Sequence, residues 1–538
     1  MPKWSFDCGC CFDIIGSSGN KHKLVFSPKI ESINLSCSKT WELISSGNTK
    51  GCFQLESRLG QMMAKKLKPE NIEQLSGLIS ILRPGCLEAI RDGKSVTNHY
   101  IDKKNGLESI NYFHESLERS LSTTYGEMIY QEQAMSIAKD LAGFDLQEAD
   151  SLRKAIGKKK PEEMAKVKQK FLDGAKKLGI VNIQEAEEIF GWIEKSQRYS
   201  FNKSHGISYA MNAYLSAYAK AHFPEAFFVS YLKFAKDKID PQQEIKELIK
   251  NASEMDISVC LPDLRLKNPN FGIFDNKIYF GLTDIKGVGD SVFAKILDIC
   301  VNIDLYKLGW IDLLIKLLLN INSIAAKALI SSGAIDYLSK NRTEMLFELD
   351  IISSLTKKEI EYAIIVTKNT TSVKDILSYL LSHPKVNLKR KQIIQGLLQS
   401  INKPPYSLID KIEWLADTEA SLLGTAISCS KLDSYDIDMT NVDCRAFKNN
   451  DSTSNIVIAG EITNINVIKT KKGKLSGQEM SFVSIEDQTG SLDSVIFFPE
   501  TYAKYKHHLF ENNILIFVGN KSKTKDGLVV DKCFVPRS

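Results

Sequence analysis

The sequence has no apolar run of the roughly 18 residues that a membrane-spanning helix needs. Its first residues, M-P-K-W-S-F-D-C, lack the apolar segment of a secretory signal. The 11 cysteines follow no repeating spacing, which is typical of proteins in a reducing compartment. We therefore expect a cytoplasmic protein that does not contact a membrane.

The chain also lacks a strong excess of charge of either sign, because its net charge is only +5 over 538 residues. Any surface for nucleic acid must come from local clusters of basic residues. Hydrophobic content of 43% and charged content of 25% are ordinary for globular proteins. The length predicts about three or four domains of roughly 150 residues each.

A complete set of metal ligands is not evident. Cys8 and Cys11 have the spacing of a metal-binding pair, but a structural zinc site needs about four ligands. The other candidates, Cys37 and Cys52, are distant and unpaired, so we favour reduced cysteines, with no role assigned to this cluster, which also includes Cys10. The Asp436-x-Asp438 pair could hold a divalent ion, but it lies in a polar stretch that we interpret as a linker.

The stretch from 198 to 222 places a basic, aromatic loop directly before a helix. Tyr209, Ala213, Ala217 and Ala221 recur every four residues and so share one helical face. A helix start with Lys203, Ser204 and His205 beside free backbone amides would suit a phosphate group. The alternative is a buried amphipathic helix with a polar cap.

A second cationic cluster lies upstream, in the sequence S-L-R-K-A-I-G-K-K-K-P. Gly157 interrupts it and Pro161 ends it, which favours a basic loop between two helices that could hold a polyphosphate. A solvated lysine-rich helix is the alternative interpretation. The cations of the cluster are Arg153, Lys154, Lys158, Lys159 and Lys160.

Residues 281–297, G-L-T-D-I-K-G-V-G-D-S-V-F-A-K-I-L, combine a glycine hairpin with a following amphipathic helix. Gly287 and Gly289 let backbone amides approach a phosphate without obstruction from side chains, and Lys286 adds a cation. This pattern predicts a helix-hairpin-helix that binds DNA, with 327–336 as the second half of a paired module.

Residues 455–538 read as five strands with a short helix between the third and the fourth, which fits a Greek-key barrel that binds oligonucleotides. A lysine-rich loop follows the first strand, where such barrels contact single strands; a soluble surface loop is the alternative. We thus expect a multidomain α+β chain, mainly α with a C-terminal all-β barrel. The lysines of this loop are Lys469, Lys471, Lys472 and Lys474.

Several motifs occur together in one order: G-C-F-Q-L-E-S, L-R-P-G, T-Y-G-E-M-I-Y-Q-E-Q, A-D-S-L-R-K-A-I-G-K-K-K-P, F-N-K-S-H-G-I-S-Y-A and G-L-T-D-I-K-G-V-G. In this order they resemble family C replicative DNA polymerases, of the bacterial DNA polymerase III alpha subunit type. The resemblance runs from about residue 35 to the end and is most specific between 51 and 230.

The resemblance implies an organisation into five parts. These are a palm remnant (1–50), late palm and fingers (51–235), a helix-hairpin-helix region (236–345), a helical region with a linker (346–450) and an OB-fold domain (451–538). It implies that primer–template DNA and deoxynucleoside triphosphates bind here. It places Arg153, Lys154 and the 158–160 lysines near the triphosphate, and it puts Tyr199, Asn202, Lys203 and His205 in the nucleotide site.

The departures from the family concern catalysis. The family's phosphoesterase-like (PHP) domain and the palm Asp-x-Asp pair have no counterpart in this sequence. Asp7 is the one candidate for the third palm aspartate, although a gap-free match puts Ser5 at that position. Nucleotidyl transfer by two Mg²⁺ ions needs such carboxylates, so we expect them mainly on another chain.

Two hypotheses follow for function. The first is a split polymerase, in which a separate N-terminal chain bears the PHP and palm domains and this chain alone is inactive. The second is a non-catalytic DNA-binding accessory protein derived from a polymerase. A sliding clamp is a further possible partner, with Q-G-L-L-Q (395–399) as a weak candidate peptide that also reads as plain helix.

Overall fold

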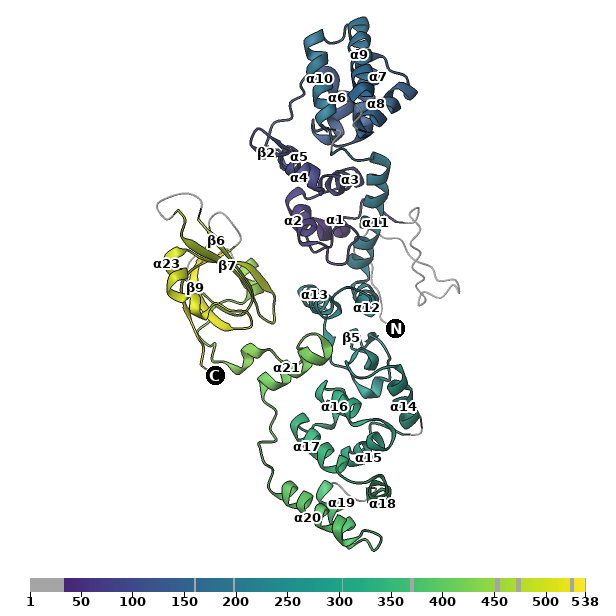
Figure 1. Ribbon diagram of the computed structural model, residues 1–538, viewed down its shortest axis with the longest axis vertical. Helices are drawn as coiled ribbons and strands as arrows, with labels where there is room; N and C mark the ends of the chain where they lie inside the picture. The colour runs from purple at the N-terminus through teal and green to yellow at the C-terminus, as the bar shows by residue number, and fades with distance from the viewer. Residues whose placement is uncertain are drawn as a thin grey trace. The chain divides into compact units, whose positions relative to one another are not determined.

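The computed structural model describes residues 33–158, 161–196, 199–301, 303–367, 372–449, 455–470, 476–522 and 527–537. The chain divides into two compact units, Met1–Phe227 and Phe228–Ser538. Helices dominate both units, and a closed β-barrel forms the C-terminal part of the second (Figure 1). The mainly helical architecture with a C-terminal barrel is confirmed, whereas the five-part division stays a prediction.

The boundary between the units falls within α12 (Pro224–Ala235), and the described residues of unit 1 form helices and one two-stranded hairpin. Its elements are α1 (Ser38–Ser45), α2 (Arg58–Leu67), α3 (Ile72–Ile81), α4 (Pro84–Glu88), β1 (Ile90–Arg91), β2 (Lys94–Ser95), α5 (Val96–Lys104), η2 (Glu115–Leu117), α6 (Glu118–Leu121), η3 (Ser122–Thr124), α7 (Gln131–Ala142), α8 (Leu146–Lys158), α9 (Pro161–Leu178), α10 (Ile183–Ser196) and α11 (Lys203–His222).

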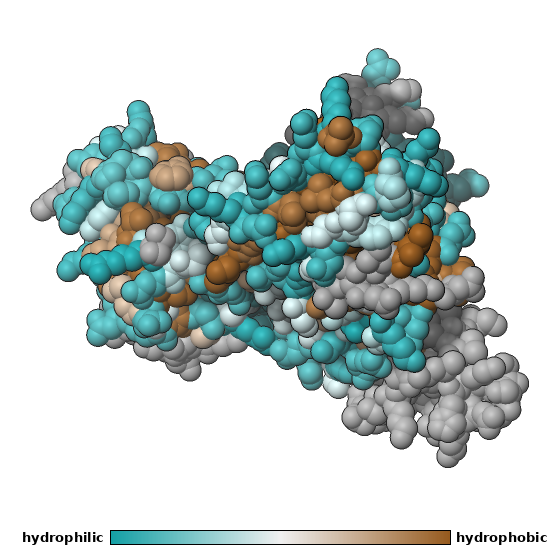
Figure 2. All heavy atoms as spheres, turned by 90° about the horizontal axis from the view of Figure 1, so that it is seen from below, coloured by the Kyte–Doolittle hydropathy of each residue, from teal (hydrophilic) through white to brown (hydrophobic). Residues whose placement is uncertain are grey.

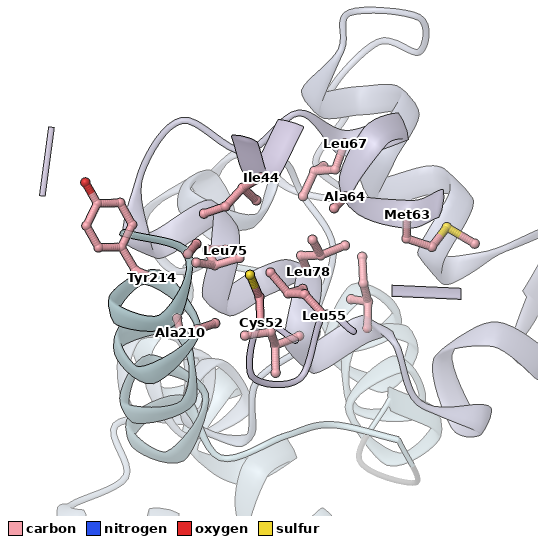
Figure 3. Packing of buried hydrophobic residues seen from close by; sticks show 14 of the residues in the cluster. Ile44, Cys52, Leu55, Met63, Ala64, Leu67, Leu75, Leu78, Ala210 and Tyr214 are labelled. Atoms are coloured by element: carbon pink, nitrogen blue, oxygen red, sulfur yellow. The ribbon is translucent and has the colours of Figure 1, made fainter. Parts of the chain in front are cut away.

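The long helix α11 packs closely on α3 because small residues line both helices. A Cβ added at Gly206 would lie 2.8 Å from Ser76 Oγ and 3.0 Å from Ser80 Oγ. Further along α11, Ala210 and Tyr214 are buried in the same core as Leu75 of α3 (Figure 3). The predicted four-residue repeat of α11 is buried at Ala213, Ala217 and Ala221, whereas its first member, Tyr209, is half-buried.

Helices α7 to α10 form a second core in unit 1. Phe171 of α9 lies 5.4 Å from Phe190 of α10, measured between ring centroids, and both side chains are buried. Gly174 lets α9 approach α7, since a Cβ there would lie 2.0 Å from the Ala142 carbonyl oxygen. This helical group carries the basic cluster around Arg153.

Unit 2 begins with helices and a three-stranded sheet of order β3-β5-β4. Its elements are α13 (Pro241–Glu254), β3 (Val259–Cys260), η4 (Leu264–Leu266), β4 (Gly272–Phe274), β5 (Lys277–Tyr279), η5 (Leu282–Asp284), α14 (Asp290–Cys300), α15 (Trp310–Asn320), α16 (Ser323–Ser331), η6 (Asp336–Leu338), α17 (Arg342–Ser353), α18 (Lys357–Thr367), α19 (Val373–Ser382), α20 (Leu388–Asn402), α21 (Ile412–Leu423), η7 (Lys431–Ser434) and α22 (Cys444–Asn449).

The closed barrel has the strand order β10-β8-β7-β6-β9. Apolar side chains such as Val483, Phe497 and Phe517 fill its interior. The predicted five strands, with a helix between the third and the fourth, are confirmed. The elements are β6 (Ile456–Lys469), β7 (Glu479–Glu486), β8 (Ser491–Phe497), α23 (Pro499–Tyr505), η8 (Lys506–His508), β9 (Ile514–Lys521) and β10 (Leu528–Phe534).

Helices accommodate a proline and a glycine in unit 1. Pro84 opens helix α4 at a position where its missing N–H costs nothing. Gly157 was expected to lie in a basic loop, but α8 continues to Lys158 and α9 begins at Pro161. Arg153, Lys154 and Lys158 therefore lie on a helix, because one glycine lowers helix stability only by about 1 kcal/mol.

Hydrophilic side chains dominate the face shown in Figure 2, and apolar side chains reach it only in strips between them. Within the described residues, no helix combines the length and the apolar character that crossing a bilayer requires.

The packing of α3 predicts opposite effects for two glycines of unit 1. A Cβ at Gly77 would lie 2.1 Å from Tyr100 Oη, whereas a Cβ at Gly191 in α10 would meet nothing within 4 Å. We expect Gly77→Ala to lower the free energy of unfolding by about 1–3 kcal/mol through overpacking. Gly191→Ala, the matched control, should raise it by about 0.5–1 kcal/mol. Urea denaturation measures both, and a Gly77→Ala variant as stable as the parent would contradict this packing.

Candidate functional site

The N-terminus of α11 is held by a carboxylate from α7, 70 residues earlier in the chain. Glu132 accepts hydrogen bonds from the Asn202 side-chain amide at 2.8 Å and from the Lys203 backbone N–H at 2.9 Å. Asn202 in turn caps the helix by accepting from the His205 N–H at 2.9 Å. A carboxylate at a helix N-terminus is stabilising because it satisfies free donors and the helix dipole.

Because of these bonds, the helix start does not offer the free backbone amides that the predicted phosphate site requires. The backbone amides of Lys203 and His205 already have acceptors within the chain. What this end of the helix presents outward is the exposed His205 ring and the half-buried Lys203 side chain. The Lys203 ammonium lies 2.6 Å from a carboxylate oxygen of Glu73 in α3, in a pair that water can reach.

A row of aromatic rings runs from this helix end onto the preceding loop. The Tyr209 ring lies 5.2 Å from that of Phe53 and 4.1 Å from that of His205, measured between centroids. His205 in turn lies 5.3 Å from Phe201, and the Arg83 guanidinium covers the Phe201 ring at 3.6 Å from its centroid. We call these five residues the aromatic row. Its outer members are accessible, since Phe53 is 39% exposed.

Tyr199 belongs to the inner side of this region. Tyr199 is half-buried beside the start of α4. A Cβ added at Gly85 would lie 2.7 Å from the Cβ of Tyr199. Burial raises the pKa of the Tyr199 hydroxyl well above its ordinary value, and it also raises the pKa of the neighbouring Cys86 to about 12. The structure therefore brings Asn202, Lys203 and His205 together at the surface and Tyr199 behind them.

The basic cluster of α8 is paired with its own helix. Asp150 accepts hydrogen bonds from Arg153 at 2.8 and 2.9 Å, and its other oxygen lies 2.6 Å from the Lys154 ammonium. Hydrogen bonds from Lys154 and Arg153 hold the pKa of the Asp150 carboxyl below its ordinary value. Lys158 is the last residue of α8, while Lys159 and Lys160 lie outside the described residues.

The hairpin before α14 has the predicted form. Gly287 has a φ of +97°, which favours glycine, and Val288 between the two glycines is buried. A Cβ at Gly289 would meet nothing within 4 Å, so the backbone there is open to a ligand. The Lys286 side chain is exposed, although its backbone N–H is used by the Leu422 carbonyl at 3.0 Å.

The stretch 327–336, predicted as the second half of the paired module, comprises the end of α16 and the turn that follows it. Its assignment to such a module stays a prediction. Helices α15 and α16 are joined by a short turn at Ile321 and Asn322, and Asn322 caps α16 by accepting from the Ala325 N–H. That turn contains no glycine, unlike the one before α14.

Of the predicted lysines in the barrel loop, only Lys469 lies among the described residues. Lys469 is the last residue of β6, is exposed, and pairs in register with Glu479 of β7. Lys471, Lys472 and Lys474 lie outside the described residues.

The predicted metal candidates do not form a site in the part of the chain that the structure describes, which holds no group of three or more His, Cys, Asp or Glu side chains placed to bind an ion. Asp7 and the cysteines before residue 33 lie outside that part, while Cys37 and Cys52 are buried thiols. Asp436 accepts a long hydrogen bond, 3.4 Å, from the Asp438 backbone N–H.

Sequence reasoning missed the role of Glu132. The sequence shows it only as one polar residue in Y-Q-E-Q, seven residues after Tyr125 and far from α11. No local pattern links it to Asn202, since such a cap depends on tertiary contact.

Three family models match successive parts of the chain. The model described as "Bacterial DNA polymerase III alpha subunit finger domain" matches residues 12–179. A "Helix-hairpin-helix motif" matches 256–345, and an "OB-fold nucleic acid binding domain" matches 456–535. The last two coincide with the hairpin before α14 and with the closed barrel.

Curated relatives cover nearly all of the chain. It is 32% identical over 485 residues to "DNA polymerase III subunit alpha" of Aquifex aeolicus, which is 89% of this chain and 37% of that protein. It is 31% identical over 514 residues to the protein of that name from Borreliella burgdorferi, 94% of this chain and 42% of the relative. For Escherichia coli K12 the values are 30% over 517 residues, 92% and 40%. The chain thus spans about two fifths of the length of these relatives.

A buried carboxyl beside the glycine hairpin predicts a pH dependence. Burial raises the pKa of Asp284 to about 6, although the amides of Gly281 and Phe271 and the charge of Lys236 oppose this. The folded state therefore favours the protonated carboxyl. The resulting stability is complete below the ordinary pKa of 3.8 and is lost as the pH rises through about 6.

We expect Asp284→Asn to remove this loss, so that the variant gains stability relative to the parent between about pH 3.8 and 6. Urea unfolding at several pH values measures the difference. The exposed Asp290 of the same module provides the control variant, Asp290→Asn, which should keep the parent's pH profile. Parallel profiles of parent and Asp284→Asn would contradict the assignment.

Proposed function

We propose, from the premise that this chain corresponds to the finger, helix-hairpin-helix and OB-fold region of bacterial DNA polymerase III alpha subunits, that it supplies nucleotide-binding and DNA-binding surfaces of a DNA-directed DNA polymerase. The reaction is template-directed addition of a deoxynucleotide to a primer 3′ end. The chain's part is to hold the incoming triphosphate and the DNA in position.

The aromatic row beside Lys203 is the observation that carries this proposal. Bases stack on aromatic rings whatever their sequence, and an ammonium at the same helix end suits the attached phosphates. Both features meet at the N-terminus of α11, where Glu132 fixes the backbone. A plain buried helix with a polar cap would not need accessible rings such as those of Phe53 and His205.

The α8 cations fit the same proposal as a second contact to phosphate. Arg153 and Lys154 share one carboxylate, Asp150, so a single anion faces two cations. Such half-exposed pairs contribute only about 0–1 kcal/mol each, so a triphosphate can replace the carboxylate. The net positive charge of this trio remains available to a polyanion.

The DNA surfaces of the proposal lie in unit 2. The open backbone at Gly289 and the Lys286 ammonium would contact a duplex phosphate. The exposed Lys469 at the end of β6 would meet a single strand. A sliding-clamp contact stays a prediction, since 395–399 lies inside α20 as the plain-helix alternative expects.

The described residues do not fit the two Mg²⁺ ions that the family's reaction requires, because they offer no cluster of carboxylates. We therefore place the metal-binding carboxylates mainly on a separate polymerase chain that bears the palm. Asp7 is the one candidate for such a carboxylate within this sequence.

Primer extension tests the proposal directly. We expect the pure chain to bind primer–template DNA with an affinity that falls as salt rises, and to extend no primer in Mg²⁺ with four deoxynucleotides. A mixture with a palm-bearing chain should extend the primer. Extension by the pure chain would contradict the split arrangement. DNA binding without extension in any mixture would instead support the accessory-protein alternative.

In the active mixture, Lys203→Ala should raise the KM for deoxynucleotides by about ten-fold, since a charge-assisted phosphate contact is lost. Its exposed pair with Glu73 contributes little to stability, so the variant should fold normally. Lys195, exposed on α10, provides the matched control variant Lys195→Ala. Equal KM values for both variants would remove Lys203 from the nucleotide site.

A further inference from the structure

A buried carboxylate, Glu127, holds three separate segments of unit 1 together. Its side chain is 1% exposed and accepts two hydrogen bonds from the Arg91 guanidinium, at 2.5 and 3.1 Å. The Lys103 ammonium donates a third at 2.9 Å. Arg91 comes from the β1–β2 hairpin and Lys103 from the end of α5, while Glu127 lies in the loop before α7.

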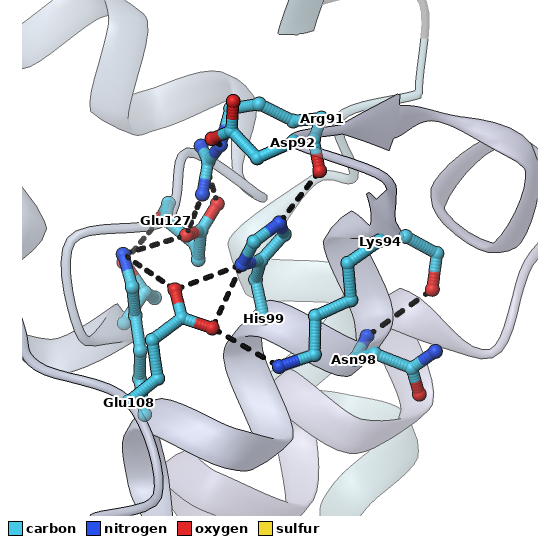
Figure 4. A network of polar contacts seen from close by, with 10 residues as sticks. Arg91, Asp92, Lys94, Asn98, His99, Glu108 and Glu127 are labelled. Carbon is cyan, nitrogen blue, oxygen red and sulfur yellow. Dashed lines mark hydrogen bonds and ion pairs between the residues drawn. The ribbon is translucent and has the colours of Figure 1, made fainter.

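A second carboxylate extends this network, as Figure 4 shows. Glu108 accepts from Lys94 at 3.1 Å and lies 2.8 Å from Nδ1 of His99, whose Nε2 lies 2.9 Å from the Arg91 carbonyl oxygen. Burial alone would raise the pKa of Glu108, but the hydrogen bonds from His99 and Lys94 lower it overall. The β1–β2 hairpin is thus fixed at both its side chains and its backbone.

The Glu127–Arg91 pair also completes a closed circuit of contacts. The circuit runs from Glu127 through Phe201 and Arg83 of the aromatic row and back to Arg91. Two residues after Glu127, the Ile129 carbonyl accepts from the Phe201 N–H at 2.8 Å, and the Phe201 carbonyl accepts from the Gln131 N–H at 2.9 Å. The Phe201 ring lies under Arg83, the N-cap residue of α4. Helix α4 leads directly into β1 and so returns to Arg91.

The other links in this circuit, among the described residues, are the connecting backbone, its hydrogen bonds and side-chain contacts such as that of Arg83 with Phe201. The Glu127–Arg91 pair adds a bidentate ion pair that fixes the spacing of the two arms. A purely stabilising role does not account well for it, because a buried ion pair often contributes less than apolar packing of the same volume. The bidentate geometry instead fixes distance and angle together. Residues that flank a site in this way hold its groups in the productive arrangement.

We propose that Glu127 and Arg91 are positioning residues that hold two members of the aromatic row, Arg83 and Phe201, in place beside its nucleotide-facing rings. This inference rests on the proposed function for the identity of the ligand. The placement of Arg83 and Phe201 by Glu127 and Arg91 needs no ligand and can be measured in the ligand-free chain.

The clean variant is Arg91→Met in the full chain. It cuts the link but leaves Glu127 paired with Lys103, so no buried charge is left without a partner. The matched control is Lys94→Met, on the same hairpin, which removes ion pairs to Asp102 and Glu108 but lies outside the circuit of contacts. Arg91→Lys keeps the charge and loses the bidentate geometry.

Hydrogen exchange of the ligand-free chain gives the first readout. We expect Arg91→Met to speed exchange of the Phe201 and Gln131 amides by about ten-fold, with Arg91→Lys in between and Lys94→Met close to the parent. Equal acceleration by Lys94→Met, or none by Arg91→Met, would overturn the positioning role. The melting temperature of each variant separates this local effect from a general loss of stability.

Binding of a fluorescent deoxynucleoside triphosphate to the chain with primer–template DNA gives the second readout. Arg91→Met should raise the Kd about ten-fold and Lys94→Met less than about two-fold. If the parent binds no triphosphate while the exchange result holds, the proposed function fails and the positioning of Phe201 stands. If the parent binds and Arg91→Met binds equally well, the positioning inference fails and the proposed function stands.

Discussion

The close packing of α11 on α3 is the constraint on which the rest of unit 1 depends. Gly206 lies against Ser76 and Ser80, and only small side chains at these positions let the two helices approach so closely. This contact fixes where the N-terminus of α11 emerges, and Glu132 then fixes its backbone. The accessible rings and the Lys203 ammonium follow from that placement, so the candidate site is a consequence of helix packing more than of any local motif.

Ion pairs within the chain are a second feature of the cations in unit 1. The cations that the proposal assigns to phosphate are already paired within the chain, Lys203 with Glu73 and both Arg153 and Lys154 with Asp150. These pairs are accessible to water and weak, so they keep long side chains ordered without preventing exchange for a stronger anion. The pair of Glu127 with Arg91 is of the other kind, since the carboxylate is buried and loss of both Arg91 and Lys103 would leave its charge unpaired in a low-dielectric setting.

Much of this could be predicted from the sequence because the signals are local. The repeat of α11, the glycines of the hairpin before α14 and the alternation of the barrel strands each reflect contacts that recur every two to four residues. Glu132 and Glu127 could not be predicted in the same way, because their partners are far away in sequence and any exposed loop could carry such residues. Gly157 was misjudged for a different reason, since a single glycine is tolerated inside a helix.

The account depends most directly on where the nucleobase lies. A photoreactive deoxyadenosine triphosphate, cross-linked to the chain in the presence of primer–template DNA and mapped by mass spectrometry, would locate it. The account predicts adducts on Phe53 and on residues 201–209, with competition by unmodified triphosphate. Adducts confined to unit 2, or adducts on unit 1 that competitor does not reduce, would contradict it.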